Sequence, residues 1–463
     1  ELVQSSLKPV VEDRLEDATT GQKEDALLDI SVCDPASGSG AFLIAANNFL
    51  AQRLARIRSD SDYPPEEQIR KASRDVLQHC IYAVDLNPMA VELAKVSLWI
   101  NSAVEDKPLN FLDHHIKCGN SLIGTNSDLL EGEFPADAYE TSGGRDWHVG
   151  NDIRKRVRNE NKERSKGSSE SSLQQWGAGK EEYVDLAERL EAIGEENTSD
   201  IKKKRRLYDE LQQSEAFQQE KLAFDVWTAA FYWPMDGSAG EYPTPSTIEK
   251  IRRNPNPENE ALQELIDRST ELAERQRFFH WELEFPSVYS NGGFDCILGN
   301  PPWDKVEMRE KEFFATLDAR ISSAETAAKR ESLIKKLETE NPELYKRYQK
   351  ALKTVERKSK FLKESGRFPL TSYGVLNIYA PFVGFALDNI KDKGRVGMIV
   401  PSTLATGSNT QKFFREIIEG ENLVSLYDFE NRNGIFPDIH KSYKFCLLTL
   451  SGAKDPVDEF KLS

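Results

Sequence analysis

The stretch from Leu27 to Ala46 reads LLDISVCDPASGSGAFLIAA, in which two apolar segments flank a turn rich in glycine and serine. We predict a buried strand over Leu27–Cys33, a turn over 34–40 and a helix over Ala41–Ile57, because glycine and proline separate two apolar segments of different period. A strand, a glycine turn and a helix in succession are typical of a parallel sheet covered by helices.

The same succession recurs further along the chain. The apolar run Ile81–Val84 ends in Asp85, and Asn87 and Pro88 are a favourable cap and first residue for the next helix. Phe294–Gly299 is another apolar run, and it leads directly into Asn-Pro-Pro-Trp. Strands that alternate with helices predict an α/β fold built on a mainly parallel sheet.

The alternation stops in two places. Residues 125–276 are rich in glycine, serine and charge, and residues 307–370 have a helical and basic pattern. We therefore predict a sheet domain assembled from residues 1–124, 277–306 and 371–463, with two helical insertions between its parts. The segment FDVWTAAFYW in the first insertion is too apolar to be exposed, so we expect it to pack that insertion onto the core.

Charge and cysteine content restrict the class of protein. The net charge of −16 and the isoelectric point near 5.1 argue against a surface that binds phosphate everywhere, so nucleic-acid binding would need a local basic face. We predict this face in the segment 346–367, and the candidate phosphate contacts are Lys353, Arg357, Lys358 and Lys360. Five widely spaced cysteines and the absence of a long apolar stretch predict a reduced, cytoplasmic protein without membrane association.

Ligands of a parallel sheet bind beyond the carboxyl ends of its strands, where this chain has glycine and carboxylate residues. Gly38 and Gly40 allow a close approach to the backbone, and Asp34 can accept a hydrogen bond from an amino group. Asp85 is suited to accept both hydroxyls of a ribose. A nicotinamide dinucleotide would need a third glycine where Leu43 stands and an acidic residue nearer to the turn. A nucleoside without phosphates fits better, and S-adenosylmethionine is the most common such cofactor.

Several stretches resemble the motifs of one enzyme family. DPASGSGAFL, AVDLNPMAVELAKVSL and CGNSLIG are similar to the cofactor motifs of gamma-type N6-adenine DNA methyltransferases, and FDCILGNPPW is similar to their catalytic motif. FDVWTAAFYW and FHWELEFP resemble segments of type IIG restriction-modification methylases and of PglX-type methyltransferases of BREX phage defence. The resemblance implies a Rossmann-like, seven-stranded class I methyltransferase fold with helical insertions. It also implies double-stranded DNA as substrate and defence-system proteins as partners.

The resemblance assigns roles to residues of these motifs. The residues expected to bind S-adenosylmethionine are Asp34, Pro35, Ala36, Ser37, Gly38, Gly40, Asp85, Leu86, Asn120 and Ser121. The residues expected to be catalytic are Asn300, Pro301, Pro302 and Trp303. The carbonyl oxygens of Asn300 and Pro301 would accept both hydrogens of the adenine amino group and direct its lone pair at the methyl group. Trp303 would stack on the extruded base.

Two features depart from the family pattern. Asn120 stands where aspartate is more common, and its carbonyl oxygen still accepts a hydrogen bond. Only Glu1-Leu2-Val3 remains of an upstream cofactor motif that usually reads Thr-Pro-x-x-Leu-Val. We therefore expect the start of this motif, and a target-recognition domain beyond the core, to be missing.

Other interpretations compete with this one. A protein glutamine or an RNA guanine amino group is an alternative substrate, because enzymes with an Asn-Pro-Pro-aromatic motif act on both, and an inactive DNA-binding scaffold is a further hypothesis. Asp113, His114, His115 and Cys118 are zinc-ligand types, but we predict no metal, because adjacent side chains of a strand-like segment point to opposite faces. Phe436 is either an edge contact for the extruded base in the DNA-binding surface or a core residue of a hairpin.

Overall fold

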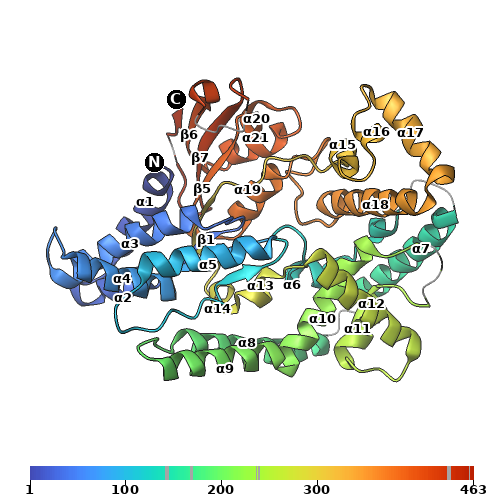
Figure 1. Cartoon of the computed structure of the whole chain (residues 1–463). Helices are drawn as coiled ribbons and strands as arrows, with labels where there is room; N and C mark the ends of the chain where they lie inside the picture. Colours follow the sequence, from blue (N-terminus) through green and yellow to red (C-terminus); the bar gives the residue numbers. More distant parts are fainter. Residues whose placement is uncertain are drawn as a thin grey trace.

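The computed structural model describes residues 1–140, 145–166, 170–235, 237, 240–434, 440–457 and 459–462. Within these residues, one eight-stranded sheet lies at the centre, in the order β3-β2-β1-β4-β5-β7-β6-β8 (Figure 1). The strands are β1 (Val32–Asp34), β2 (Ile81–Asp85), β3 (Ile116–Cys118), β4 (Phe294–Gly299), β5 (Ile390–Pro401), β6 (Leu423–Glu430), β7 (Lys444–Ser451) and β8 (Lys461–Leu462). The strands β1 to β5 pair in parallel, and β7 runs antiparallel between β5 and β6.

The predicted mixed α/β architecture is present, with two differences in detail. The described sheet has eight strands rather than seven, because Lys461–Leu462 pairs in parallel with β6. The first strand is shorter than predicted, because Lys23–Leu28 forms the helix α2 and only Val32–Asp34 enters the sheet. Leu27 is buried in this helix, and burial alone does not distinguish a short helix from a strand.

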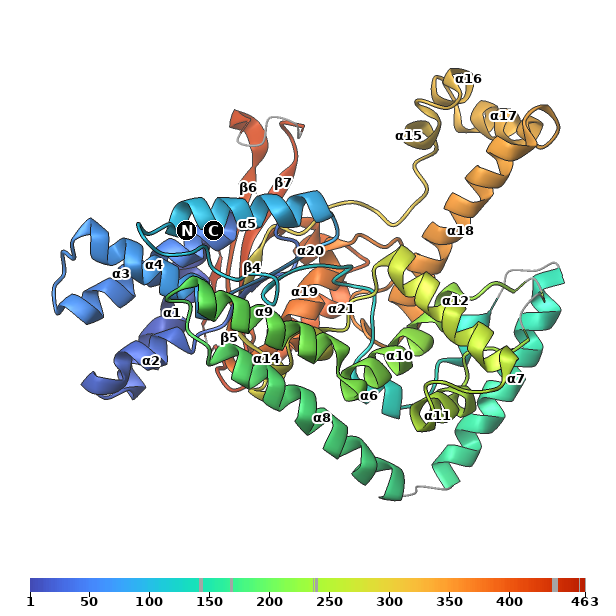
Figure 2. The same ribbon diagram turned by 60° about the horizontal axis from the view of Figure 1, so that its bottom comes forward.

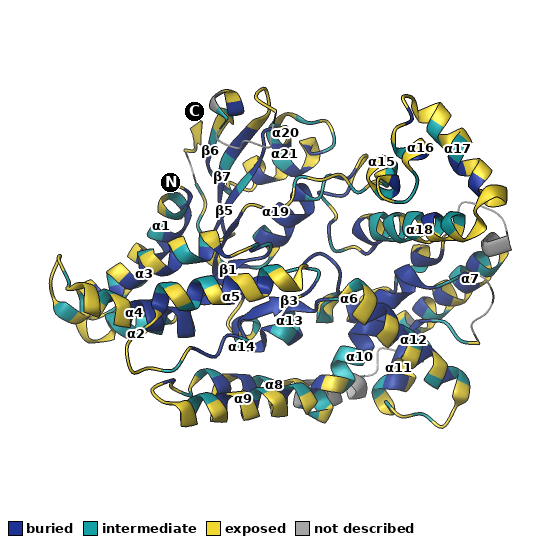
Figure 3. Cartoon of the chain, viewed as in Figure 1, coloured by how far each residue is buried: buried dark blue, intermediate teal, exposed yellow. Residues whose placement is uncertain are grey.

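Helices cover both faces of the sheet (Figure 3). One face packs against α1 (Leu2–Asp17), α2, α3 (Ala41–Ser59), α4 (Glu66–His79) and α5 (Pro88–Ser102). The other face packs against the first insertion and against α13 (Trp281–Glu284), α14 (Pro286–Ser290), α19 (Tyr379–Asp388), α20 (Thr403–Thr406) and α21 (Gln411–Glu419). Two short 3-10 helices, η1 (Thr20–Gln22) and η4 (Asn431–Asn433), connect other elements. Val32 packs among the apolar residues of the face covered by α1 to α5, and Cys33 packs among those of the other face. Alternate strand residues are therefore buried on opposite faces of the sheet.

The first insertion is helical and is packed onto the core. Its elements are α6 (Ser127–Glu131), η2 (Ala136–Tyr139), α7 (Arg145–Lys166), α8 (Glu170–Glu191), α9 (Thr198–Gln213), α10 (Glu215–Ala229), η3 (Ala230–Tyr232), α11 (Pro245–Arg253) and α12 (Glu260–Gln276). FDVWTAAFYW forms the end of α10 and η3, and its apolar side chains are buried in the same cluster as Phe294 of β4. This segment attaches the insertion to the sheet, as the sequence predicts.

The second insertion extends away from the sheet (Figure 2). It consists of α15 (Glu310–Phe314), α16 (Ala319–Ser322), α17 (Ala327–Glu340) and α18 (Pro342–Glu364). Phe314 and Tyr348 are part of a small apolar cluster of its own, and Phe361 and Leu362 at the end of α18 are buried in the main core. In the described parts of the chain, every helix is too short or too polar to cross a bilayer.

Candidate active site

The candidate site residues gather where β1, β2 and β4 end. β1 lies between the other two strands and pairs in parallel with both. Asp34, Asp85 and Gly299 are the last residues of these strands, so they stand at the same edge of the sheet. The predicted cofactor motifs and the predicted catalytic motif therefore begin at neighbouring positions.

The glycine turn, residues 34–40, is held against the end of β2. The backbone N–H of Gly38 donates to Oδ2 of Asp85 over 2.8 Å. Gly40 caps α3 with a φ of 87°, and a Cβ at this position would lie 3.3 Å from the Cβ of Ala94. The left-handed backbone and the close approach of α5 both favour glycine here.

Asp34 is a buried carboxylate at the start of the turn. Its side chain is 1% exposed, and its Oδ1 accepts a hydrogen bond of 3.0 Å from the N–H of Ala36. Burial and, to a smaller extent, the charge of Asp85 raise the pKa of Asp34 to about 7, although the hydrogen bond from Ala36 lowers it. A positively charged ligand beside Asp34 would favour its ionised form.

Asp34 also joins the glycine turn to the predicted catalytic turn. A Cβ at Gly299 would lie 2.6 Å from Oδ1 of Asp34, so this carboxylate packs on the backbone immediately before Asn300. Any residue with a side chain would displace the carboxylate. Two motifs that are far apart in the sequence therefore meet at one place.

The third cofactor motif contacts the glycine turn as well. The hydroxyl of Ser121 donates to the carbonyl of Pro35 over 2.5 Å, and the N–H of Gly119 donates to the carbonyl of Asp85 over 3.0 Å. The predicted cofactor residues that remain differ in exposure: Pro35 and Ser37 are buried, Ala36 and Asn120 are half-buried, and Leu86 is 49% exposed. The three segments that carry all ten predicted cofactor residues are thus hydrogen-bonded to one another.

The predicted catalytic turn, Asn300–Trp303, follows β4 directly. Asn300 and Pro302 are exposed, whereas Pro301 is buried. Trp303 is half-buried, and its indole N–H donates to the carbonyl of Ile399 over 3.3 Å. The orientation of this indole is therefore set by β5.

Three aromatic side chains near Trp303 were not predicted. The rings of Trp303 and Tyr443 are stacked, with centroids 5.5 Å apart and an interplanar angle of 8°. Phe445 lies 6.3 Å from Trp303, and Phe429 stacks on Phe445 at 5.5 Å. Tyr443 and Phe445 occupy alternate positions, and this spacing is the sequence signal that could have identified them as one strand face. Phe436 lies outside the described residues.

Two family profiles match the chain. The profile described as Eco57I restriction-modification methylase matches residues 79–436, which is more than half of the chain. The chain belongs to the Eco57I restriction-modification methylase family. The profile described as MmeI, DNA-methyltransferase domain, matches residues 15–122. The predicted likeness to type IIG restriction-modification methylases is confirmed.

A curated relative of this Eco57I-family chain is a Methanocaldococcus jannaschii protein whose name describes a type II restriction enzyme and methyltransferase. The two are 27% identical over 311 residues, which make up 64% of this chain and 24% of the relative. The chain therefore spans about a quarter of that relative's length.

Two solved structures are more distantly similar to the Eco57I-family chain. One is the ATP-dependent Type ISP restriction-modification enzyme LlaBIII bound to DNA, with 10% identity and a TM-score of 0.35 over 98% of this chain and 19% of the other. The second is the DrdV–DNA complex, with 10% identity and a TM-score of 0.34 over 98% of this chain and 28% of the other. Because similarity at such TM-scores is too weak to assign a fold, the fold is described from the strand order alone.

Part of the predicted basic face on α18 of the Eco57I-family chain is occupied by internal contacts. The guanidinium of Arg357 donates to the carbonyls of Tyr232 and Trp233, over 2.7 and 3.2 Å. The ammonium of Lys360 donates to the carbonyl of Glu140. These two residues attach α18 to the first insertion, and contact of either with DNA stays a prediction.

The two other predicted basic residues differ in environment. Lys353 is exposed on α18. Lys358 is half-buried, and burial lowers its pKa, an effect that the nearby carboxylate of Asp304 opposes. Because Asp304 follows Trp303 directly, Lys358 lies near the predicted catalytic turn. Contact of Lys353 and Lys358 with DNA also stays a prediction.

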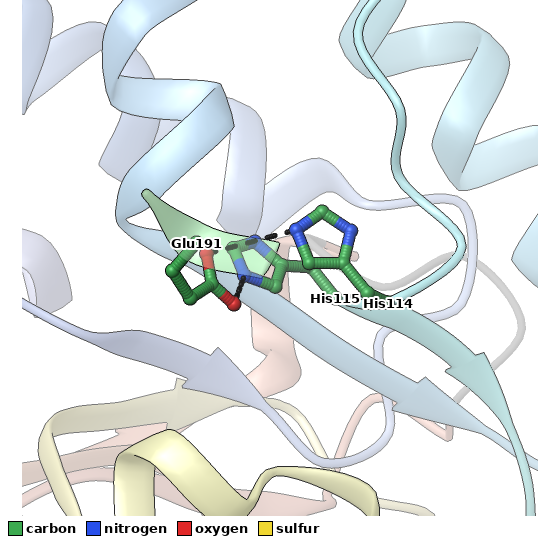
Figure 4. Close-up of side chains that lie close together, drawn as sticks. All are labelled: His114, His115 and Glu191. Carbon is green, nitrogen blue, oxygen red and sulfur yellow. Dashed lines mark hydrogen bonds and ion pairs between the residues drawn. The ribbon is translucent and has the colours of Figure 1, made fainter. Parts of the chain in front are cut away.

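His114 and His115 lie side by side (Figure 4). Their ring centroids are 3.9 Å apart, and both rings face Glu191 of α8. Nε2 of His115 lies 2.9 Å from Oε1 of Glu191, and Nε2 of His114 lies 3.7 Å from Oε2. The expectation that adjacent side chains point to opposite faces was wrong, because this pair lies in a turn before β3.

Glu191 of α8 is hydrogen-bonded to Nε2 of His115, whereas Nε2 of His114 has no hydrogen-bond partner among the described residues. The ligand-type atoms of the three residues lie within 4.8 Å of one another. In the described part of the chain, both Nδ1 atoms lack hydrogen-bond partners, whereas metal-bound histidines usually donate that N–H. Of the other predicted ligand types, Asp113 accepts from Lys95 and Cys118 from Arg277. Burial holds the pKa of His114 well below its usual range, so this ring is neutral.

Proposed function

We propose that this chain transfers a methyl group from S-adenosylmethionine to the N6 amino group of adenine in double-stranded DNA. The observation that carries the proposal is the contact of the Asp34 carboxylate with Gly299. It places the turn that would hold adenine beside the turn that would hold the methyl donor. Direct transfer between two bound molecules requires this proximity.

The sheet supports the proposal. In this proposal, strands β1 to β7 would be the seven strands of a Rossmann-like class I methyltransferase fold, with the two-residue strand β8 added at the edge next to β6. The glycine turn lies at the end of the central strand β1, where ligands of open parallel sheets bind.

The residues at this edge fit S-adenosylmethionine. The buried carboxylate of Asp34 would gain a favourable partner from a positively charged ligand. Asp85 already accepts from two backbone N–H groups, and a carboxylate has about four acceptor positions, so two remain for the ribose hydroxyls. Leu86 offers an apolar surface to the adenine ring, and Asn120 offers a carbonyl oxygen to its amino group. When bound, the cofactor would supply an electrophilic methyl group on its sulfonium.

The residues of the catalytic turn suit an amino group as the acceptor. The nitrogen of an aromatic amine is a weak nucleophile because its lone pair is delocalised into the ring. The side-chain carbonyl of Asn300 and the backbone carbonyl of Pro301 would accept its two hydrogens and localise the lone pair on nitrogen. Neither proline has an N–H that would compete for these acceptors. Trp303, oriented by Ile399, would provide a stacking surface for the extruded base, which is worth about 1–3 kcal/mol.

The family supports the remaining parts of the proposal. Membership among restriction-modification methylases supports duplex DNA as substrate, a role in restriction-modification or phage defence with defence proteins as partners, and a cytoplasmic location. Lys353 and Lys358 are proposed to contact phosphates beside the catalytic turn.

Transfer of labelled methyl groups tests the proposal. The chain is incubated with S-adenosylmethionine labelled on its methyl group and, separately, with plasmid DNA, protein and RNA. We expect label in the DNA, released by nuclease digestion as N6-methyladenine. Label in protein or RNA but not in DNA, or on a base other than adenine, would contradict the proposal. Saturable binding of DNA without any transfer would favour the inactive scaffold.

A further inference from the structure

The segment Arg277–Glu284, here called the signature segment, contains most of FHWELEFP and has no part in the chemistry proposed above. It lies along residues Gly119–Thr125, here called the cofactor loop. We propose that Trp281, supported by His280 and Asp225, is a positioning residue that holds the cofactor loop in the conformation that binds S-adenosylmethionine. This inference rests on the proposed function.

The backbones of the two segments pair with each other. The N–H of Asn120 donates to the carbonyl of Arg277 over 2.8 Å, and the N–H of Phe279 donates to the carbonyl of Ile123 over 2.8 Å. Asn120 and Phe278 form a parallel bridge. The signature segment therefore supports the cofactor loop as a neighbouring strand would.

Two glycines of the cofactor loop make room for Phe279. A Cβ at Gly119 would lie 2.2 Å from Cδ2 of the Phe279 ring, and a Cβ at Gly124 would lie 2.0 Å from the Phe279 carbonyl oxygen. Phe279 is 2% exposed. The backbone of the loop thus rests directly on the signature segment, without space for side chains between them.

Trp281 fixes the part of the loop that faces the glycine turn. Its buried indole N–H donates to the carbonyl of Ser121 over 2.9 Å. Ser121 in turn donates its hydroxyl to the carbonyl of Pro35 over 2.5 Å. A single residue, Ser121, therefore links Trp281 to the glycine turn. Trp281 also holds the backbone next to Asn120, whose side chain is proposed to bind the cofactor.

His280 anchors the end of the loop to the first insertion. Its Nδ1 accepts a hydrogen bond of 3.1 Å from the N–H of Thr125, so its Nε2 carries the proton and donates to Oδ1 of Asp225 over 3.0 Å. Asp225 belongs to FDVWTAAFYW and also pairs with Lys221 at 2.6 Å. Burial raises the pKa of Asp225, but Lys221 and His280 outweigh it and hold this pKa below its usual range. A single role, holding the cofactor loop in place, thus accounts for both FDVWTAAFYW and FHWELEFP.

The substitution Trp281→Phe tests the proposal, because it keeps a buried aromatic ring and removes the indole N–H. The buried carbonyl of Ser121 then loses its donor, which is costly away from water. We expect the Kd and the KM for S-adenosylmethionine to rise about tenfold, the factor that corresponds to about 1.4 kcal/mol. We expect kcat at saturating cofactor and the affinity for DNA to stay unchanged, since only binding of the cofactor is weakened.

Trp227→Phe is the matched control. Trp227 is 1% exposed in the main core cluster, and within the described residues its Nε1 has no hydrogen-bond partner. Both variants lose the same atoms from a buried site, but only Trp281→Phe also leaves a buried carbonyl without its donor, so we expect Trp227→Phe to lower Tm by no more than Trp281→Phe does. Only Trp281→Phe should raise the KM for the cofactor. Equal KM values for the two variants would overturn the inference. No cofactor binding by the unmutated chain would instead count against the proposed function.

A second variant tests the other hydrogen bond of Ser121, and its combination with Trp281→Phe tests whether the two hydrogen bonds act together. Ser121→Ala removes the hydrogen bond to Pro35 and leaves the indole contact in place. We expect a higher KM for the cofactor, and a combined variant with Trp281→Phe whose effect is smaller than the product of the two, because both act through one connection. An unchanged KM in Ser121→Ala, or fully multiplicative effects, would overturn the inference.

Discussion

The two sides of the candidate site are built differently. On the cofactor side, the glycine turn, the end of β2 and the cofactor loop are hydrogen-bonded to one another, and Asp34 and Ser121 are buried. On the substrate side, Asn300 and Pro302 are exposed, and the turn is oriented through Trp303. For the proposed roles, the segments that would bind the cofactor are held in place by hydrogen bonds, whereas the turn that would bind the base is exposed to a nucleotide that enters from a duplex.

The largest effect is expected from Asn300→Ala, on the open side. Removing a preorganised acceptor should lower kcat for DNA methylation by at least about 100-fold, because this acceptor acts on the reacting nitrogen. Binding of S-adenosylmethionine, measured by titration calorimetry, should not change. Asn291→Ala, at an exposed position before β4, is the control and should keep full activity. A loss of cofactor binding in Asn300→Ala would break the distinction between the two sides.

The next largest effect is expected from Gly299→Ala, at the junction of the two sides. The added methyl group would lie 2.6 Å from Oδ1 of Asp34, so the carboxylate or the strand must move. Overpacking of this kind costs about 1–3 kcal/mol, and we expect a lower Tm together with a higher KM for the cofactor and a lower kcat. Gly21→Ala is the control, since nothing lies within 4 Å of its added Cβ. Normal Tm and activity in Gly299→Ala would show that the two turns do not meet.

The role of Asp34 on the cofactor side is tested by comparing the pH dependence of cofactor binding in the unmutated chain and in Asp34→Asn. Because burial raises the pKa of Asp34 to about 7, a cationic cofactor should bind more tightly as pH rises from about 6 to about 8. The affinity for the cofactor should increase about tenfold for each unit by which the bound cofactor lowers the pKa of Asp34. This increase should be absent in Asp34→Asn. A pH dependence that is the same in both proteins would contradict this role.

The same residue affects folding stability with a defined sign. In the folded chain the pKa of Asp34 is raised above its ordinary value of 3.8, so the folded state binds this proton more strongly than the unfolded state does. Its contribution to stability is fully present below about pH 4 and is lost as pH rises toward about 7. Denaturant titrations should show this loss in the unmutated chain and not in Asp34→Asn.

The smallest effect is expected from Lys358→Ala, beside the open side. Loss of one phosphate contact should weaken duplex binding equally for all sequences and reduce the slope of log K against log salt by about 1. Lys335→Ala, at an exposed position of α17 outside the predicted basic face, is the control and should leave the slope unchanged. Cofactor affinity should be normal in both variants. An unchanged salt slope in Lys358→Ala would show that Lys358 does not contact the DNA.

Much of the cofactor side could be predicted from the sequence, because its signals are local. Asn87 was predicted to cap a helix, and its side chain accepts from the N–H of Met89 at the start of α5. The eighth strand could not be predicted, since Lys461–Leu462 is exposed and too short to show a period. The side-by-side rings of His114 and His115 were missed because a turn of three residues has no pattern that distinguishes it from the start of a strand.

By itself, the sequence determined that Asp34, Asp85 and Asn300 would each stand at the end of a buried strand, because apolar period, glycine and proline act over a few neighbouring residues. Only the tertiary structure decided that Trp281 reaches Ser121 and that Arg357 holds Tyr232, contacts that join residues 160 and 125 positions apart. The first contact depends on where the chain returns to the sheet after the first insertion, and the second depends on how the two insertions pack on each other. No local pattern encodes that arrangement, since it follows from burying apolar surface shared by distant segments.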